Sequence, residues 1–126
     1  LTQSTFRERV VGLWQECAVT GIQEVSYLVA SHIKPWRLCT EREKLDPENG
    51  LLLNPSVDKL FDIGHISFDD MGYLVSRQEL WSSGDLQKLG ILPNMSLSRP
   101  MTRRMTEYMR FHRETVFKFS LNCSRS

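Results

Sequence analysis

Apolar and polar residues alternate along the first third of the chain in two different periods. Phe6 and Val10 recur at helical spacing, which predicts a helix over residues 4–15. Residues 25–33, VSYLVASHI, are rich in Val, Ile and Tyr and predict a strand that carries His32 near its end. A helix followed by a strand is therefore expected before the first proline.

The middle of the chain has clear signals for a loop, a strand and a helix. Residues 34–48 are polar, contain two prolines and predict a long loop. Residues 50–53, GLLL, predict a short buried strand. Asn54 as cap, Pro55 at the first helical position and Gly64 beyond the end predict a helix that runs to about residue 62.

The last half contains a predicted hairpin and two predicted helices. Residues 65–76 indicate two strands that turn at residues 69–72, where Asp and Gly suit a tight turn. Residues 84–91 predict a short helix, and residues 100–119 show the longest helical pattern. Helices and short antiparallel strands in separate stretches predict an α+β fold.

Length and composition restrict the class of protein. With 126 residues, 40% hydrophobic and 25% charged, the chain suits one globular domain. No apolar run approaches the roughly 20 residues of a membrane helix. Three cysteines without a Cys-x-x-Cys pair argue against a disulfide framework and a four-ligand zinc site, and favour a cytoplasmic location. Because the chain begins at Leu1, we interpret residues 1–126 as the C-terminal part of a longer protein, or as a processed start.

The charge is uneven although the net charge is only +1. Residues 101–126 carry six Lys/Arg and two Glu. A basic C-terminal element could contact phosphates, and the alternative is a solvated helix face.

Two carboxylates on the predicted middle helix form a candidate metal site. Asp58 and Asp62 are four positions apart and share a flank, where like charges cost an isolated helix roughly 0.2–0.5 kcal/mol. A divalent cation would relieve this repulsion, and hard oxygen ligands suit Mg²⁺ or Mn²⁺. The alternative is a merely solvated pair.

His32 and Asn49 complete the candidate site. Histidine is the natural base at neutral pH, although a lone histidine at the end of an apolar strand is often a satisfied polar group. Asn49 could brace the long loop through backbone hydrogen bonds, and Gly50 would permit a tight turn into the strand.

The order His32, Asn49, Asp58 resembles the motif of the HNH endonuclease family, with its last histidine replaced by aspartate. The stretch NGLLL followed by LFDxG is typical of that family, and YMRFHRETVF resembles the closing helix of its restriction-type subgroup. The resemblance implies a ββα-metal core with flanking N-terminal and C-terminal helices and an added β-hairpin.

The resemblance also implies a function, the cleavage of DNA phosphodiesters to 5′-phosphate and 3′-hydroxyl ends. His32 would be the base, Asn49 the catalytic brace, and Asp58 and Asp62 the ligands of one divalent ion, Mg²⁺ or Mn²⁺ before Ni²⁺ or Zn²⁺. Ser31 stands where many relatives carry an additional ligand.

Several residues outside this motif have simpler interpretations. We expect Cys17 to pack, His65 to lie on the hairpin surface and His112 to be structural. Candidate DNA contacts are Lys34, Arg37, Arg103, Arg110 and Arg113.

The resulting hypothesis is a single HNH nuclease domain of a restriction or defence protein. It would act with a fused or associated recognition domain, or as a homodimer. The alternatives are a DNA-binding module that does not cut and a protein-interaction domain.

Overall fold

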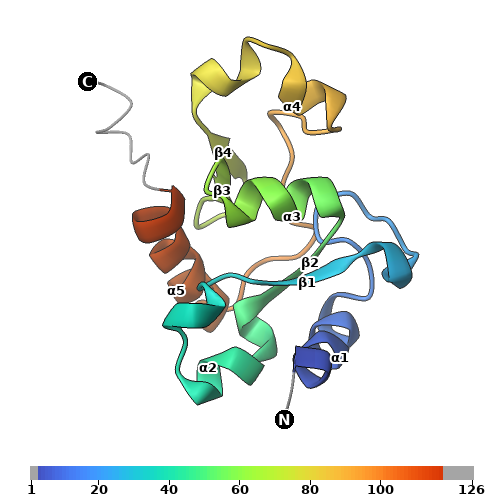
Figure 1. Cartoon of the computed structure of the whole chain (residues 1–126), viewed down its shortest axis with the longest axis vertical. Coiled ribbons are helices and arrows are strands. Elements are labelled where there is room, and N and C mark those ends of the chain that lie inside the picture. Colours follow the sequence, from blue (N-terminus) through green and yellow to red (C-terminus); the bar gives the residue numbers. More distant parts are fainter. Residues whose placement is uncertain (1–2, 118–126) are drawn as a thin grey trace.

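The computed structural model describes residues 3–117, which form an α+β fold around a small antiparallel pair of strands (Figure 1). Strand β1 (Val29–His32) pairs with β2 (Gly50–Leu53), and His32 lies opposite Gly50 in the register. Helix α1 (Gln3–Trp14) lies on one side of this pair and α3 (Pro55–Asp62) on the other (Figure 1). This confirms the predicted class and the strand–strand–helix order of a ββα core.

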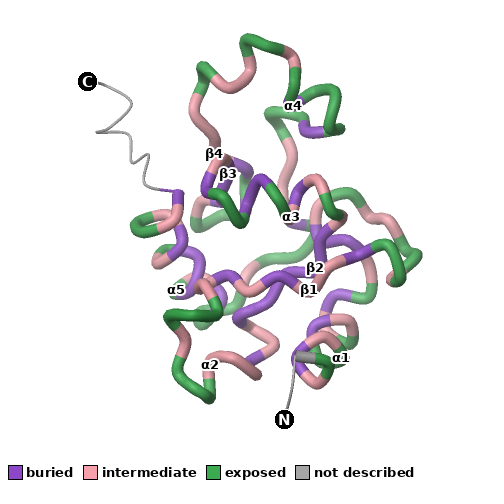
Figure 2. Tube along the Cα trace, viewed as in Figure 1, coloured by how far each residue is buried: buried purple, intermediate pink, exposed green. Residues whose placement is uncertain are grey.

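Burial follows directly from this layering. All four residues of β2 are buried because both faces of the strand are covered. In α3, Val57, Leu60 and Phe61 are buried, as their helical spacing predicts. Figure 2 shows buried residues along β2 and the inner face of α3, whereas the segment around α4 (Asp85–Lys88) is largely exposed.

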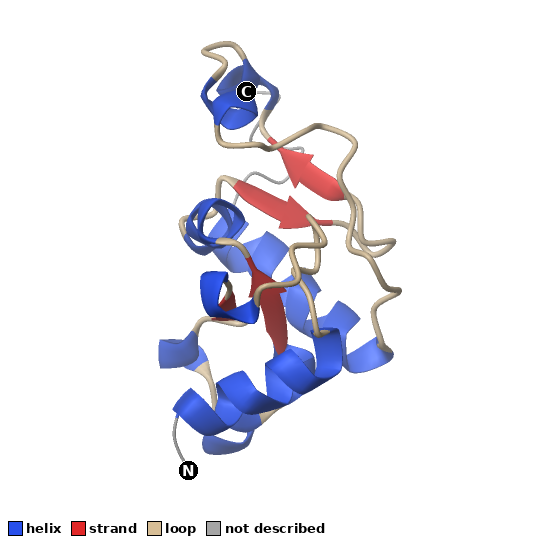
Figure 3. Cartoon of the chain, turned by 90° about the vertical axis from the view of Figure 1, so that its right-hand side faces the viewer, coloured by secondary structure: helices blue, strands red, loops and turns tan. Residues whose placement is uncertain are grey.

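The second half of the chain packs near the C-terminal end of α3, where Gly64 lies against Val116. Strands β3 (Ile66–Phe68) and β4 (Leu74–Ser76) form the predicted hairpin, separate from the first pair (Figure 3). Helix α5 (Arg103–His112) continues into a wider, π-helical turn (Arg113–Phe117). A Cβ atom on Gly64 would lie 2.2 Å from the Val116 carbonyl oxygen, so glycine permits this contact. Within residues 3–117, no helix is long and apolar enough to cross a membrane.

Two predicted boundaries near the first strand were wrong. The predicted strand 25–33 is shorter because Val25–Tyr27 forms a 3-10 turn. The predicted loop 34–48 contains helix α2 (Glu41–Leu45). A reciprocal capping box starts this helix: the Thr40 hydroxyl accepts from the Glu43 N–H, and the Glu43 carboxylate accepts from the Thr40 N–H.

The last predicted helix is also shorter than its apolar pattern. Thr102 caps it by accepting a hydrogen bond from the Met105 N–H, so the regular helix begins at Arg103. Residues 118–119 of the predicted helix lie outside the described residues.

Candidate functional site

His32 is the last residue of β1, and its ring is held on two sides. It stacks parallel to the Phe6 ring, with centroids 3.7 Å apart and an interplanar angle of 8°. Its Nε2 lies 2.8 Å from the Lys44 carbonyl oxygen. Because a carbonyl can only accept, Nε2 carries the proton and Nδ1 presents a lone pair.

The environment of His32 keeps the imidazole neutral. Burial lowers the pKa of His32, and the hydrogen bond to Lys44 opposes this effect only in part. The ring is half-buried, and no residue of the described chain donates a hydrogen bond to Nδ1. Nδ1 is therefore unprotonated at neutral pH and could accept a proton.

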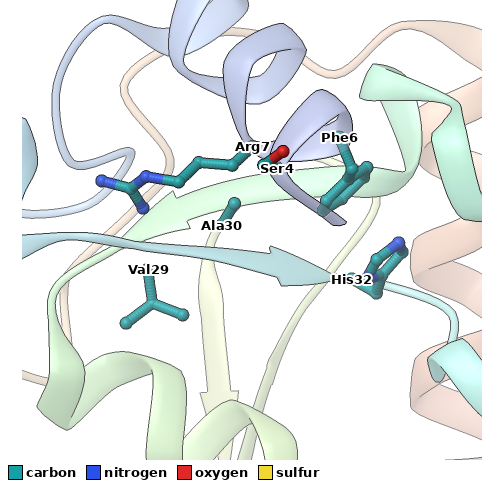
Figure 4. Close-up of a pocket in the computed structure, with 6 residues that line it drawn as sticks. All are labelled: Ser4, Phe6, Arg7, Val29, Ala30 and His32. Atoms are coloured by element: carbon teal, nitrogen blue, oxygen red, sulfur yellow. The ribbon is translucent and has the colours of Figure 1, made fainter. Parts of the chain in front are cut away.

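A pocket of about 350 Å³ opens beside this ring on the α1 side of β1 (Figure 4). Arg7 cannot move freely there, because its guanidinium donates to the Leu28 and Val25 carbonyls at 2.7 Å each. The pocket leaves room for a ligand next to His32. It is lined by Ser4, Phe6, Arg7, Val29, Ala30 and His32.

Asn49 is fully buried and ties the two ends of the 34–48 segment together. Its Oδ1 accepts from the Lys34 N–H at 2.8 Å. Its Nδ2 donates to the Glu43 carbonyl at 3.1 Å and to the Cys39 sulfur at 3.3 Å. These bonds are the bracing expected from the sequence, and a part in catalysis stays a prediction.

The predicted tight turn at Gly50 is wrong, and this glycine is required for a different reason. Its backbone is extended, with φ −137°, a conformation open to any residue. A Cβ atom would lie 2.4 Å from Val10 Cγ2 and 2.9 Å from Phe6 Cζ. Glycine therefore lets α1 press onto β2, which places Phe6 under the ring of His32. Sequence reasoning missed this role of Phe6, and its helical spacing signalled only a core position.

The two aspartates lie on α3, on the opposite side of β1 from the Phe6 stack, and His32 is the residue that ends the strand between the two sides (Figure 1). Asp58 is half-buried, and burial raises its pKa; a hydrogen bond from Ser31 opposes the shift and the charge of Asp62 adds to it. Successive strand residues face opposite ways, so Ser31 meets α3 whereas His32 meets α1. Among residues 3–117, no hydrogen bond or ion pair joins His32 to Asp58 or Asp62.

Asp58 and its neighbours Asp62 and Ser31 offer oxygen atoms, the ligand type that a hydrated hard cation takes. No group of three or more His, Cys, Asp or Glu side chains in the described part of the chain could enclose a metal ion. Mg²⁺ keeps several waters and is commonly held by one or two carboxylates, which Asp58 and Asp62 supply beside the Ser31 hydroxyl. Oxygen donors of this kind suit Mg²⁺ or Mn²⁺ better than Zn²⁺ or Ni²⁺, and metal binding by Asp58 and Asp62 stays a prediction.

Four of the five candidate DNA contacts form an ion pair within the protein, and the pair of Arg103 with Glu107 is the longest of the four. Lys34 pairs with Glu43 at 2.9 Å. Arg110 and Arg113 both pair with Asp70, at 3.3 and 2.6 Å. Their charges are therefore partly neutralised.

Arg103 and Arg37 are the most accessible of the five candidates. The Arg103 side chain is 95% exposed and lies 3.6 Å from Glu107. Arg37 is exposed, and no ion pair involves it within the described chain. These two arginines are the more available contacts for phosphate.

His112 is buried and fully bonded, as expected for a structural residue. Its Nε2 donates to the Phe61 carbonyl, and its Nδ1 accepts from the Ser67 hydroxyl, both at 2.8 Å. Cys17 is likewise buried, and His65 is half-buried beside the hairpin.

Comparison with known protein families agrees with this geometry. Residues 17–69 match a family model described as HNH endonuclease. The matched segment contains β1, β2 and α3 and all four predicted catalytic and metal-binding residues. No curated protein matches the chain.

Proposed function

We propose, from the match of residues 17–69 to the HNH endonuclease family, that this protein is a metal-dependent DNA endonuclease. The family supports a nuclease or nucleic-acid-binding role. More specifically, we propose that it hydrolyses phosphodiester bonds to give 5′-phosphate and 3′-hydroxyl ends. The observation that carries it is the contact of His32 Nε2 with the Lys44 carbonyl, which leaves Nδ1 without a donor among residues 3–117, beside an open pocket.

In this proposal His32 removes a proton from the attacking water. Nδ1 accepts the proton, while the Lys44 carbonyl keeps its hydrogen bond to Nε2 and stabilises the imidazolium that forms. Stacking on Phe6 restricts ring rotation, so the lone pair keeps one direction. Asn49 maintains this arrangement by bracing the segment that contains Lys44.

Asp58 and Asp62, beside Ser31, are the residues that would hold the divalent ion. When bound, Mg²⁺ or Mn²⁺ supplies positive charge that stabilises the phosphate and the leaving oxygen. The two carboxylates repel each other, and this repulsion favours cation uptake.

Weak intrinsic attraction for DNA is expected from the net charge of +1. Arg37 and Arg103 are the first candidates for phosphate contact, with Lys34, Arg110 and Arg113 available if their ion pairs open. We extend the proposal to a cytoplasmic restriction or defence protein in which this single domain cuts and another domain or a second copy supplies recognition.

The test is cleavage of supercoiled plasmid with Mg²⁺ or Mn²⁺ by native protein, His32→Ala and His65→Ala. Loss of the base should lower the cleavage rate by about 10²–10⁴-fold, and His65→Ala, a histidine outside the site, should cut normally. Equal rates for native protein and His32→Ala would refute the assignment of the base. DNA binding without cleavage in either metal would favour the non-cleaving alternative.

A further inference from the structure

Three successive backbone carbonyls at the end of α2 are bonded by side chains from three different parts of the chain. The last carbonyls of a helix have no partner within it, so such bonds complete the helix end. They also hold the segment in one position relative to β1. The acceptor–donor pairs are Glu43 with Asn49 at 3.1 Å, Lys44 with His32 at 2.8 Å, and Leu45 with Arg9 at 3.0 Å.

Helix α2 cannot hold this position by itself. It has five residues and no buried side chain, and isolated helices so short are unstable in water. An anchor is needed close to the Lys44 carbonyl, because that oxygen selects the protonated nitrogen of His32.

Asp46, two residues after Lys44, provides such an anchor. Its side chain is 7% exposed. It accepts hydrogen bonds from Arg104 Nε at 2.7 Å and from the Tyr108 hydroxyl at 2.8 Å, both on α5. It also accepts from the Glu48 N–H at 3.0 Å.

The carboxylate of Asp46 is stable in its charged form. Burial works to raise its pKa, but the hydrogen bonds from Arg104 and Tyr108 outweigh this effect and the pKa lies below its ordinary value. A buried, fully bonded carboxylate has little freedom to move, so it ties the end of α2 to α5.

We propose that Asp46, held by Arg104 and Tyr108, is a positioning residue for His32. Through the backbone of residues 44–46 it fixes the Lys44 carbonyl, and this carbonyl keeps the imidazole proton on Nε2. Helix α5, which is far from His32 in the sequence, would then help to hold the His32 ring through Asp46. The role of His32 as a base rests on the proposed function, whereas the effect of Asp46 on the His32 tautomer does not.

The experiment measures the His32 tautomer by ¹H–¹⁵N correlation spectra of metal-free, DNA-free protein at mildly basic pH. Native protein should show the Nε2–H form. Asp46→Asn should show a substantial fraction of the Nδ1–H form, because the weakened anchor lets the Lys44 carbonyl move. Glu114→Gln is the matched control, since it makes the same chemical change at an exposed position.

Tyr108→Phe removes one hydrogen bond and keeps the ring, so it serves if Asp46→Asn does not fold. It should shift the tautomer less, and Tyr27→Phe, at a side chain that is 66% exposed, should not shift it. In cleavage assays Asp46→Asn should lower kcat by about 10-fold or more with KM for DNA unchanged.

A folded Asp46→Asn protein with the native tautomer would overturn the proposal, as would a Tyr108→Phe spectrum identical to native if that variant alone folds. If native protein cuts no DNA, the proposed function fails, and the tautomer spectra still decide the role of Asp46.

Discussion

The two histidines that the structure places most firmly, His32 and His112, have nearly the same surroundings. Each ring is stacked on a phenylalanine with centroids 3.7 Å apart, Phe6 in one case and Phe61 in the other. Each Nε2 lies 2.8 Å from a backbone carbonyl oxygen. Stacking and this bond therefore do not distinguish a candidate base from a core residue.

The difference lies at the second nitrogen. His112 is 1% exposed, and the Ser67 hydroxyl donates to its Nδ1. The Nδ1 of His32 has no such donor among residues 3–117, and its ring borders the pocket of Figure 4. The same ring stack and carbonyl contact therefore surround a structural residue, His112, whose two nitrogens are both bonded, and a candidate catalyst, His32, whose Nδ1 lone pair is accessible.

The largest effect on folding is expected from removing His112. His112→Ala leaves a cavity, removes the side-chain donor from the Phe61 carbonyl, and leaves the buried Ser67 hydroxyl with only the Met109 sulfur, at 3.8 Å, as a partner. It should cost about 3 kcal/mol of unfolding free energy. His32→Ala should cost less than about 1 kcal/mol of unfolding free energy, because its half-buried site can admit water. Urea unfolding of both variants checks this, and equal costs would remove the distinction between the two sites.

Acidification should sharpen the comparison. Burial lowers the pKa of His112 to about 4, well below its usual 6.5. Between these values the unfolded chain binds the proton more tightly, so the stabilisation is complete above pH 6.5 and declines as the pH falls toward 4. We expect a loss of about 2 kcal/mol at pH 5 relative to pH 7.

Variants assign this loss to one histidine or the other. His112→Gln should abolish most of the decline, and His32→Gln should remove a smaller part, since the pKa of His32 is also lowered. A decline that is unchanged in His112→Gln would contradict the assignment.

The smallest effect is expected at Asp58, whose carboxylate, unlike the His112 ring, should lower the stability of the metal-free protein. Burial raises the pKa of Asp58, and the charge of Asp62 adds to the shift, so keeping this carboxylate ionised in the folded protein costs free energy. Asp58→Asn should stabilise the metal-free protein by about 0.2–0.5 kcal/mol. Thermal unfolding should also show that Mn²⁺ no longer stabilises this variant.

The control for this variant is Asp85→Asn, which alters an exposed carboxylate on α4 and should keep the response to Mn²⁺. A less stable Asp58→Asn protein would mean that the bond from Ser31 outweighs the repulsion.

Local chemistry allowed parts of the fold to be predicted from sequence. Asn54 and Pro55 define where α3 begins, and the Asp69–Gly72 turn defines the hairpin, because caps and turns depend on neighbouring residues. The capping box of Thr40 and Glu43 was equally local, and it was overlooked within a segment interpreted as loop.

The sequence by itself determined the order of the candidate residues, from His32 through Asn49 to Asp58. Only the tertiary structure decided what surrounds them: the Phe6 ring against His32, the Lys44 carbonyl at its Nε2, and Asp46 bonded by Arg104 and Tyr108 of α5. Asp46 and Tyr108 are 62 positions apart in the chain. Contacts of this kind leave no periodicity in a single sequence, because each partner satisfies its local pattern equally well without the other.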